Sequence, residues 1–171
     1  MDYSSLLKAS AIPGAAAMIE TFRAIGYSLE TAVADIIDNS ISAEAKNIYI
    51  NRVWKGGESI ITIRDDGYGM SNEEIIQAMR PGAQNPLEER SLTDLGRFGL
   101  GLKTASFSQC RNLTVMSKQY GGAVSYWTWS LDYVAQSDKW ELIKWAPDEY
   151  LNALDDVARG TIVIWSHLDR V

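Results

Sequence analysis

The sequence predicts an α/β two-layer sandwich, in which a mixed, mostly antiparallel sheet carries its helices on one face. Two observations favour this class. Apolar residues recur at helical spacing in the first part of the chain, and later segments alternate apolar and polar residues. Two of the alternating segments flank a glycine pair, and such short turns join antiparallel strands.

The first strong helix is expected to begin after Ser28, a residue type that caps helix N-termini, and to run to about Ala45. Its apolar stripe consists of Leu29, Ala32, Val33, Ile36 and Ile37. Strands are expected at 47–54 and 59–65, with Gly56 and Gly57 forming the hairpin turn.

Ser71 is expected to cap a short helix over 72–79, which Pro81 and Gly82 terminate. A further helix should follow the glycine-rich segment and reach about Cys110. Beyond it, the pattern predicts strands at 112–119, 123–133, 139–146 and 160–168, and a short helix at 148–157. In the second of these strands one face is predicted to hold Trp127, Trp129, Leu131 and Tyr133.

Length and composition indicate one globular domain over 1–171, with an N-terminal arm at 1–16, and we expect it to be the N-terminal part of a longer protein. The net charge of −6 excludes a domain that binds nucleic acid by its overall charge, although a local basic patch is compatible with it. No apolar run approaches the roughly 20 residues of a membrane span, so we expect no membrane partner. Without a signal peptide pattern, and with Cys110 as its single cysteine, the chain is expected to be cytoplasmic.

Three polar clusters could carry chemistry, and the first lies on the helix after Ser28. Asp35 and Asn39 are one turn apart and border the apolar stripe. A carboxylate beside an amide oxygen can orient a water molecule and hold Mg²⁺. Taken alone, the pair is also typical of a plain polar border on a helix.

The second cluster, DDGYGM, follows a predicted strand and precedes a capped helix. Gly67 and Gly69 let the backbone turn sharply and let a ligand approach, while Asp65 offers a carboxylate at the strand end. A carboxylate that accepts from an exocyclic amine is one way to recognise adenine. A plain Asp-Gly turn is the alternative.

The third cluster is GRFGLGLKTAS, residues 96–106. Backbone amides free of side chains that lead into a helix form an anion cradle, and Lys103 could reach a phosphate. The spacing matches neither a P-loop nor a dinucleotide fingerprint. The preceding polar stretch, 82–95, has no clear period and is interpreted as a lid.

In their order, the segments DIIDNSISA, DDGYGM, GRFGLGLKTAS and GTIVIW resemble the motifs of the GHKL ATPases, the superfamily of gyrase B subunits, ninety-kilodalton heat-shock chaperones, histidine kinases and mismatch-repair ATPases. The resemblance spans about Ala17 to Trp165, and its pattern is most similar to MORC-like and related prokaryotic ATPases. It implies a Bergerat fold in which ATP lies between the sheet and the lid at 82–95.

By position, the resemblance implies that Asp35 is the general base, that Asn39 binds Mg²⁺, and that Asp65 accepts from the adenine amino group with support from Thr161. The remaining nucleotide-binding positions that it implies are Gly67, Gly69, Met70, Gly96, Arg97, Phe98, Gly99, Leu100, Gly101, Leu102 and Lys103.

One position departs from the family pattern, because the base is usually glutamate and Asp35 is one methylene shorter. A base must come within hydrogen-bond reach of its proton, and a shift of about 1 Å can cost roughly 100-fold in rate. The expected function is Mg²⁺-dependent ATP hydrolysis that drives a lid and homodimer switch, with DNA or a protein as a client of regions outside this chain. The alternatives are an ATP-gated binding module with little turnover and a histidine-kinase-like ATP-binding domain.

Overall fold

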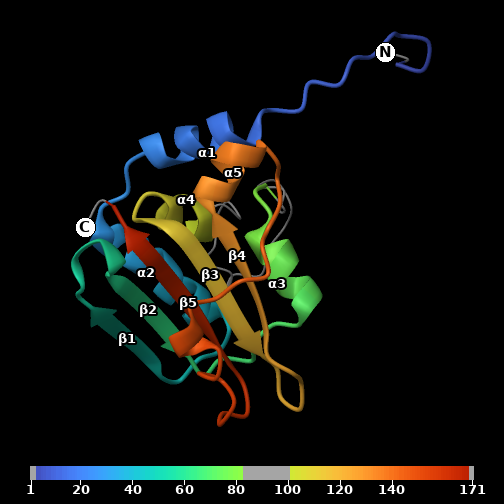
Figure 1. The fold of residues 1–171 in the computed structure, drawn as a ribbon. Coiled ribbons are helices and arrows are strands. Elements are labelled where there is room, and N and C mark those ends of the chain that lie inside the picture. Colours follow the sequence, from blue (N-terminus) through green and yellow to red (C-terminus); the bar gives the residue numbers. More distant parts are fainter. Residues whose placement is uncertain (1–2, 83–100, 170–171) are drawn as a thin grey trace.

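The computed structural model describes residues 3–82 and 101–169. Their strands form one five-stranded sheet with the order β1-β2-β5-β3-β4, and every neighbouring pair is antiparallel (Figure 1). The strands are β1 (Ile48–Val53), β2 (Ile60–Asp65), β3 (Cys110–Lys118), β4 (Ser125–Ser130) and β5 (Gly160–Leu168). The predicted fold class is confirmed.

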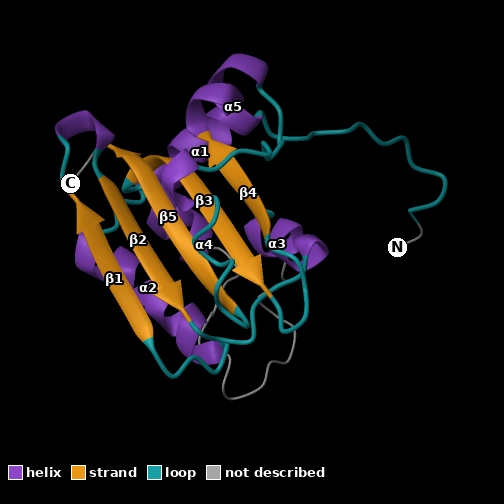
Figure 2. Cartoon of the chain, turned by 60° about the horizontal axis from the view of Figure 1, so that its bottom comes forward, coloured by secondary structure: helices purple, strands orange, loops and turns teal. Residues whose placement is uncertain are grey.

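The helices are α1 (Ala15–Ala24), α2 (Leu29–Ser42), α3 (Asn72–Met79), α4 (Gly101–Phe107) and α5 (Leu131–Ser137). In Figure 2, α2 and α4 lie behind the strands, on the face that we call the helix face. The main core lies between this face and the helices, and it includes Ile19, Ile36, Ile63, Ile75, Phe107, Leu113, Val115, Val163 and Trp165. Burial of these side chains stabilises the two layers against each other.

The other sheet face, which we call the open face, is covered in part by the irregular segment before β5. Ala146 and Leu154 of this segment pack on Met116, Ile162 and Ile164, which alternate with the core residues along β3 and β5. The sheet is therefore apolar on both faces at its centre.

The early elements follow the sequence closely. Ser28 Oγ accepts a hydrogen bond from the Thr31 amide and starts α2, which ends at Ser42. Ser71 forms a capping box with Glu74, and α3 has the predicted bounds. The turn after β1 contains a short 3-10 helix, η1 (Gly56–Glu58).

Two boundaries in the second half differ from prediction. Helix α4 ends at Phe107, and Cys110 is the first residue of β3. Strand β4 ends at Ser130, whose Oγ accepts from the Tyr133 amide and caps α5. Leu131 and Tyr133 therefore do not share a strand face with the tryptophans, because a serine N-cap lets the backbone leave the sheet.

Two further elements were predicted wrongly. The segment 139–146 is no strand, and within it Ile143 forms an isolated β-bridge with Thr128 of β4. The segment 148–157 contains no α-helix, and its regular part is the 3-10 turn η2 (Asp148–Tyr150). Trp140 and Leu142 pack against the main core, whereas Ala146, Leu151 and Leu154 pack on the open face. These apolar residues belong to segments that are mostly irregular, so periodicity was a poor guide there.

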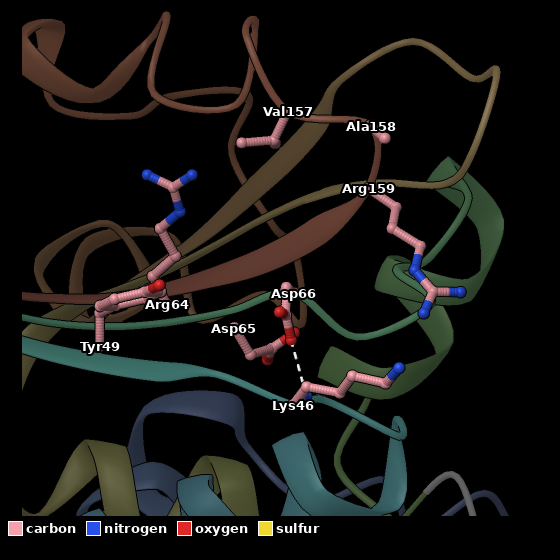
Figure 3. Close-up of a pocket in the computed structure, with 8 residues that line it drawn as sticks. All are labelled: Lys46, Tyr49, Arg64, Asp65, Asp66, Val157, Ala158 and Arg159. Carbon is pink, nitrogen blue, oxygen red and sulfur yellow. Dashed lines mark hydrogen bonds between the residues drawn. The ribbon is translucent and has the colours of Figure 1, made fainter.

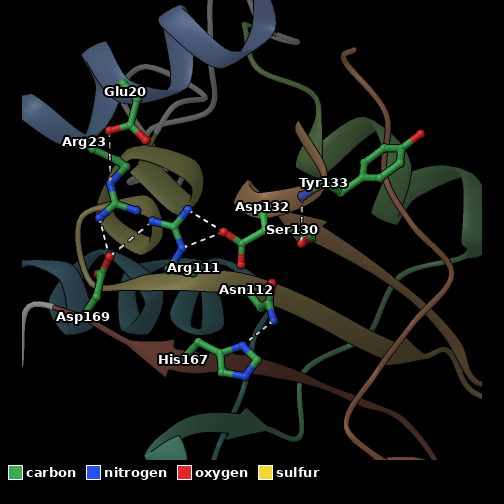
Figure 4. Close-up of polar contacts among 9 residues, drawn as sticks. All are labelled: Glu20, Arg23, Arg111, Asn112, Ser130, Asp132, Tyr133, His167 and Asp169. Carbon is green, nitrogen blue, oxygen red and sulfur yellow. Dashed lines mark hydrogen bonds and ion pairs between the residues drawn. The ribbon is translucent and has the colours of Figure 1, made fainter. Parts of the chain in front are cut away.

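A polar cluster ties α1 and α5 to one end of the sheet (Figure 4). Arg23 of α1 donates to Asp169, just after β5, and Arg111 of β3 donates to Asp132 of α5 through two nitrogens. Arg111 also lies 3.6 Å from Asp169. These charged contacts join four elements that lie far apart in the sequence.

Residues 3–12 extend away from the rest of the chain, whereas Pro13 accepts a hydrogen bond from Trp140 Nε1 (Figure 1). Helix α1 begins inside the expected arm, at Ala15. Of the expected lid at 82–95, only Gly82 lies within the described residues. Within 3–82 and 101–169, no helix is long and apolar enough to cross a membrane.

Candidate functional site

Asp65, the last residue of β2, points to the helix face and is 7% exposed. Its Oδ2 accepts a hydrogen bond from Ser40 Oγ of α2 at 2.8 Å, and its Oδ1 accepts from the Gly67 amide at 2.9 Å. Burial raises the pKa of this carboxyl, while the hydrogen bonds from Ser40 and Gly67 oppose the rise. Each oxygen keeps acceptor capacity, so the site offers a fixed, buried acceptor to a ligand.

Thr161 lies directly opposite Asp65, because β2 and β5 pair in a register that matches these two residues. Ser117 of β3 connects Thr161 to the loop after β2, because its Oγ lies 2.8 Å from Thr161 Oγ1 and accepts a hydrogen bond from the Met70 amide at 2.7 Å. Asp65, Thr161 and Ser117 thus form a row of polar side chains across three neighbouring strands, which we call the polar floor.

The loop after Asp65 can pass this floor only because two of its residues lack side chains. Gly69 has φ +73°, and a Cβ there would lie 2.0 Å from the carbonyl oxygen of Lys118. A Cβ at Gly67 would lie 2.8 Å from both Cβ and the carbonyl oxygen of Ala43. The backbone therefore approaches α2 and β3 more closely than an alanine would allow.

Asp35 lies on the side of α2 that faces the start of α4. Asp35 is half-buried, and its Oδ2 lies 3.4 Å from where a Cβ on Gly101 would sit. Burial, and then the charge of Asp38, raise the pKa of the Asp35 carboxyl. Asn39, one turn further, is exposed. The Asp35 carboxylate of the predicted pair thus stands beside the first residue of α4.

Lys103 is buried in α4, and its Nζ donates to the carbonyl oxygen of Ala78 near the end of α3 at 2.9 Å. Burial lowers the pKa of Lys103 to about 8. Leu102 packs partly against the core. The other predicted residues of the glycine segment, Gly96, Arg97, Phe98, Gly99 and Leu100, lie outside the described residues.

Sequence reasoning missed Ser40 and Ser117. Ser40 follows Ile36 by four residues, so it continues the apolar stripe of α2 with a buried hydroxyl. Ser117 likewise continues the buried face of β3 that holds Leu113 and Val115. A serine on an otherwise apolar face must find a hydrogen-bond partner, and that was the available signal.

The residues present fit a nucleotide with a metal ion. A buried acceptor suits an amino group, and the glycines leave room for close approach. Among residues 3–82 and 101–169, no three His, Cys, Asp or Glu side chains form a metal cluster. That composition is compatible with Mg²⁺, which proteins commonly hold through one or two side chains together with substrate phosphates.

The chain is similar to several curated proteins over part of its length. ATPase morc-1 of Caenorhabditis elegans is 32% identical over 91 residues, which cover 53% of this chain and 10% of that protein. The DNA mismatch repair protein MutL of Clostridium acetobutylicum is 30% identical over 110 residues, or 61% of this chain and 18% of MutL. MutL of Clostridium perfringens is 39% identical over 76 residues, or 42% of this chain and 11% of MutL. The chain thus spans less than a fifth of the length of these relatives.

A family model described as histidine kinase-, DNA gyrase B-, and HSP90-like ATPase matches residues 27–161. The matched range contains the polar floor at Asp65 and Thr161, the Asp35 and Asn39 pair, and α4. From the match over most of its length, together with the antiparallel sheet and its helix layer, the chain belongs to this family of ATPases, the GHKL superfamily.

Proposed function

We propose that this domain binds ATP with Mg²⁺ and hydrolyses it, and that the cycle drives a conformational switch. The observation that carries the proposal is the buried Asp65 carboxylate, fixed by Ser40 and Gly67 opposite Thr161. A buried acidic side chain requires a specific reason for its place, and an acceptor for a ligand amine supplies one.

In this proposal Asp65 accepts from the adenine amino group. Thr161 supports the contact through the hydroxyl pair that it forms with Ser117. Gly67 and Gly69 leave the space beside the base free of side chains. An acceptor of this kind discriminates against a purine that carries an oxygen in place of the amino group.

The triphosphate end is assigned to the other half of the site. Asn39 would supply an oxygen ligand to Mg²⁺, and the segment 96–103 would bind the phosphates. Lys103 contributes a cation held by the Ala78 carbonyl. Mg²⁺ neutralises phosphate charge when it is bound, and the protein groups position the nucleotide around it.

Asp35 is the proposed base, which accepts a proton from the attacking water. Its raised pKa favours proton acceptance near neutral pH compared with an exposed aspartate. Its side chain is short, yet Gly101 brings the start of α4 next to the carboxylate, where any larger residue would contact it. Because of the missing methylene, we expect slow turnover; an ATP-gated module with little hydrolysis is the second candidate.

Phosphate release and ATP binding test these roles separately. Asp35→Ala should abolish Mg²⁺-dependent phosphate release and retain ATP binding by calorimetry, whereas Glu30→Gln, at the exposed start of the same helix, should leave both unchanged. An increase in release from Asp35→Glu would identify side-chain length as the limiting feature. Equal release from Asp35→Ala and the unchanged chain would refute Asp35 as the base.

The switch itself is proposed for the longer protein, because the relatives extend far beyond the matched region. ATP binding would order the lid at 82–95 and favour a homodimer, with DNA or a protein as client; the name of the MutL relatives refers to DNA mismatch repair. A ligand shifts such an equilibrium only through different affinities for its two states. A solution scattering profile of the full-length protein that is unchanged by a non-hydrolysable ATP analogue would refute the switch.

A further inference from the structure

A pocket of about 450 Å³ lies on the open face of the sheet, at the end of β2 that carries Asp65. It is lined by Lys46, Tyr49, Arg64, Asp65, Asp66, Val157, Ala158 and Arg159 (Figure 3). Tyr49 and Arg64 are directly paired across β1 and β2, so both stand on one face. That face is opposite to the one where the neighbouring Asp65 bonds to α2.

The pocket concentrates positive charge on a chain whose net charge is −6. Lys46 precedes β1, Arg64 belongs to β2, and Arg159 precedes β5, so three separate segments supply the cations. Within residues 3–82 and 101–169, no carboxylate lies within 4 Å of their charged groups. Asp155 and Asp156 belong to the same loop as Arg159 but do not line the pocket.

Asp66, which lies between these cations, already accepts hydrogen bonds from neighbouring residues. Asp66 accepts from the amides of Lys46 and Asn47 at 2.7 and 2.9 Å, and from Asn47 Nδ2 at 2.8 Å. These hydrogen bonds lower the pKa of Asp66 to about 2, the side-chain bond from Asn47 being the largest cause. Figure 3 shows Arg64 on one side of Asp66 and both Lys46 and Arg159 on the other. The lining thus has three cations and two acids, and because the Asp65 side chain bonds to α2 on the other face of the sheet, the pocket keeps an excess of positive charge.

We propose that this pocket binds a compact phosphate-bearing anion, at a site separate from the nucleotide pocket on the helix face. Its volume is that of a small-molecule site, and three cations in that space match a ligand with several charges on few atoms. Phosphate groups meet this condition, since guanidinium groups bind them through paired hydrogen bonds. Carboxylates carry one charge each, and an acidic peptide would need a longer groove to present three.

The test follows backbone amide resonances of the 171-residue chain during titration with pyrophosphate in the absence of Mg²⁺. We expect saturable shifts at Lys46, Tyr49, Arg64, Asp66 and Arg159. The double variant Arg64→Gln, Arg159→Gln should weaken binding at these positions about tenfold or more. Lys139→Gln, which removes an exposed cation elsewhere, should leave them unchanged.

Resonances outside the pocket report whether the double variant is folded. If it does not fold, the single variant Lys46→Gln replaces it in the titration, because the Lys46 side chain is exposed. Shifts confined to α2 and α4, or equal weakening in Lys139→Gln, would overturn the proposal. Because the readout is local, it succeeds or fails independently of ATP binding.

Two further titrations identify the source of the phosphate. Tighter binding of pyrophosphate than of an oligothymidylate would assign the pocket to a free oligophosphate, and the reverse order would assign it to a nucleic-acid backbone. Either result supports a phosphate site. Binding of hexaglutamate at the same positions with equal affinity would contradict the phosphate class.

Discussion

Replacing Asp65 by asparagine would change the chemistry of the proposed adenine contact without changing the size of the side chain. The carboxylate has two acceptor oxygens, one facing Ser40 and one facing Gly67. In Asp65→Asn, the amide oxygen can still accept from Gly67, while Ser40 Oγ can rotate to accept from the new NH₂ group. We therefore expect the variant to fold.

The nucleotide would meet a different partner. The adenine amino group donates, and in Asp65→Asn it would face a second donor in a buried position. Loss of a hydrogen bond to a charged acceptor costs about 1.5–3 kcal/mol, which is roughly a 10- to 150-fold increase in Kd for ATP. Inosine triphosphate carries an acceptor oxygen at the same place, so its affinity should rise relative to that of ATP.

Calorimetric titration with Mg²⁺ and each nucleotide measures this change of preference. Asp66→Asn is a matched control, since that carboxylate bonds to Lys46 and Asn47 and lies outside the helix-face site. It should keep the preference for ATP. If Asp65→Asn unfolds cooperatively and binds ATP as tightly as the unchanged chain, the assignment of Asp65 to adenine is wrong.

Three further predictions follow from the packing and the ionisation. Gly69→Ala should lower the free energy of unfolding by about 3 kcal/mol or more, because the backbone is left-handed there and a Cβ would lie 2.0 Å from the Lys118 carbonyl oxygen. Chemical denaturation measures this free energy, and the control Gly57→Ala should change it by less than about 0.5 kcal/mol. Equal losses of stability in the two variants would contradict the reasoning. Burial raises the pKa of the Cys110 thiol, so iodoacetamide should modify it only after unfolding, and modification of the native chain at the rate of the denatured one would contradict this. Because the pKa of Asp65 is raised, the folded chain keeps the Asp65 proton to higher pH than the unfolded chain does. The free energy of unfolding should therefore fall as pH rises from about 4 through the folded pKa, and Asp65→Asn should lack this fall. Identical profiles of stability against pH for the two proteins would refute this assignment.

Local features of the sequence predicted much of the fold. The caps at Ser28 and Ser71 depend on hydrogen bonds within three residues, and both appear as predicted. The apolar segments at 47–54, 59–65, 112–119 and 160–168 were predicted as strands, and they contain most or all of β1, β2, β3 and β5. The prediction failed between 131 and 157, because Ser130 caps a helix and the segment after that helix is mostly irregular.

The expected chemistry can be assigned to particular residues without the structure, since acids, an amide and glycines occur in an order that resembles one ATPase superfamily. The surroundings of these residues depend on how distant segments pack. The contacts of Asp65 with Ser40, and of Thr161 with Ser117, join distant segments through strand register and helix packing. The cationic pocket on the open face arises in the same way, because three separate segments meet there and no local sequence pattern predicts that they do.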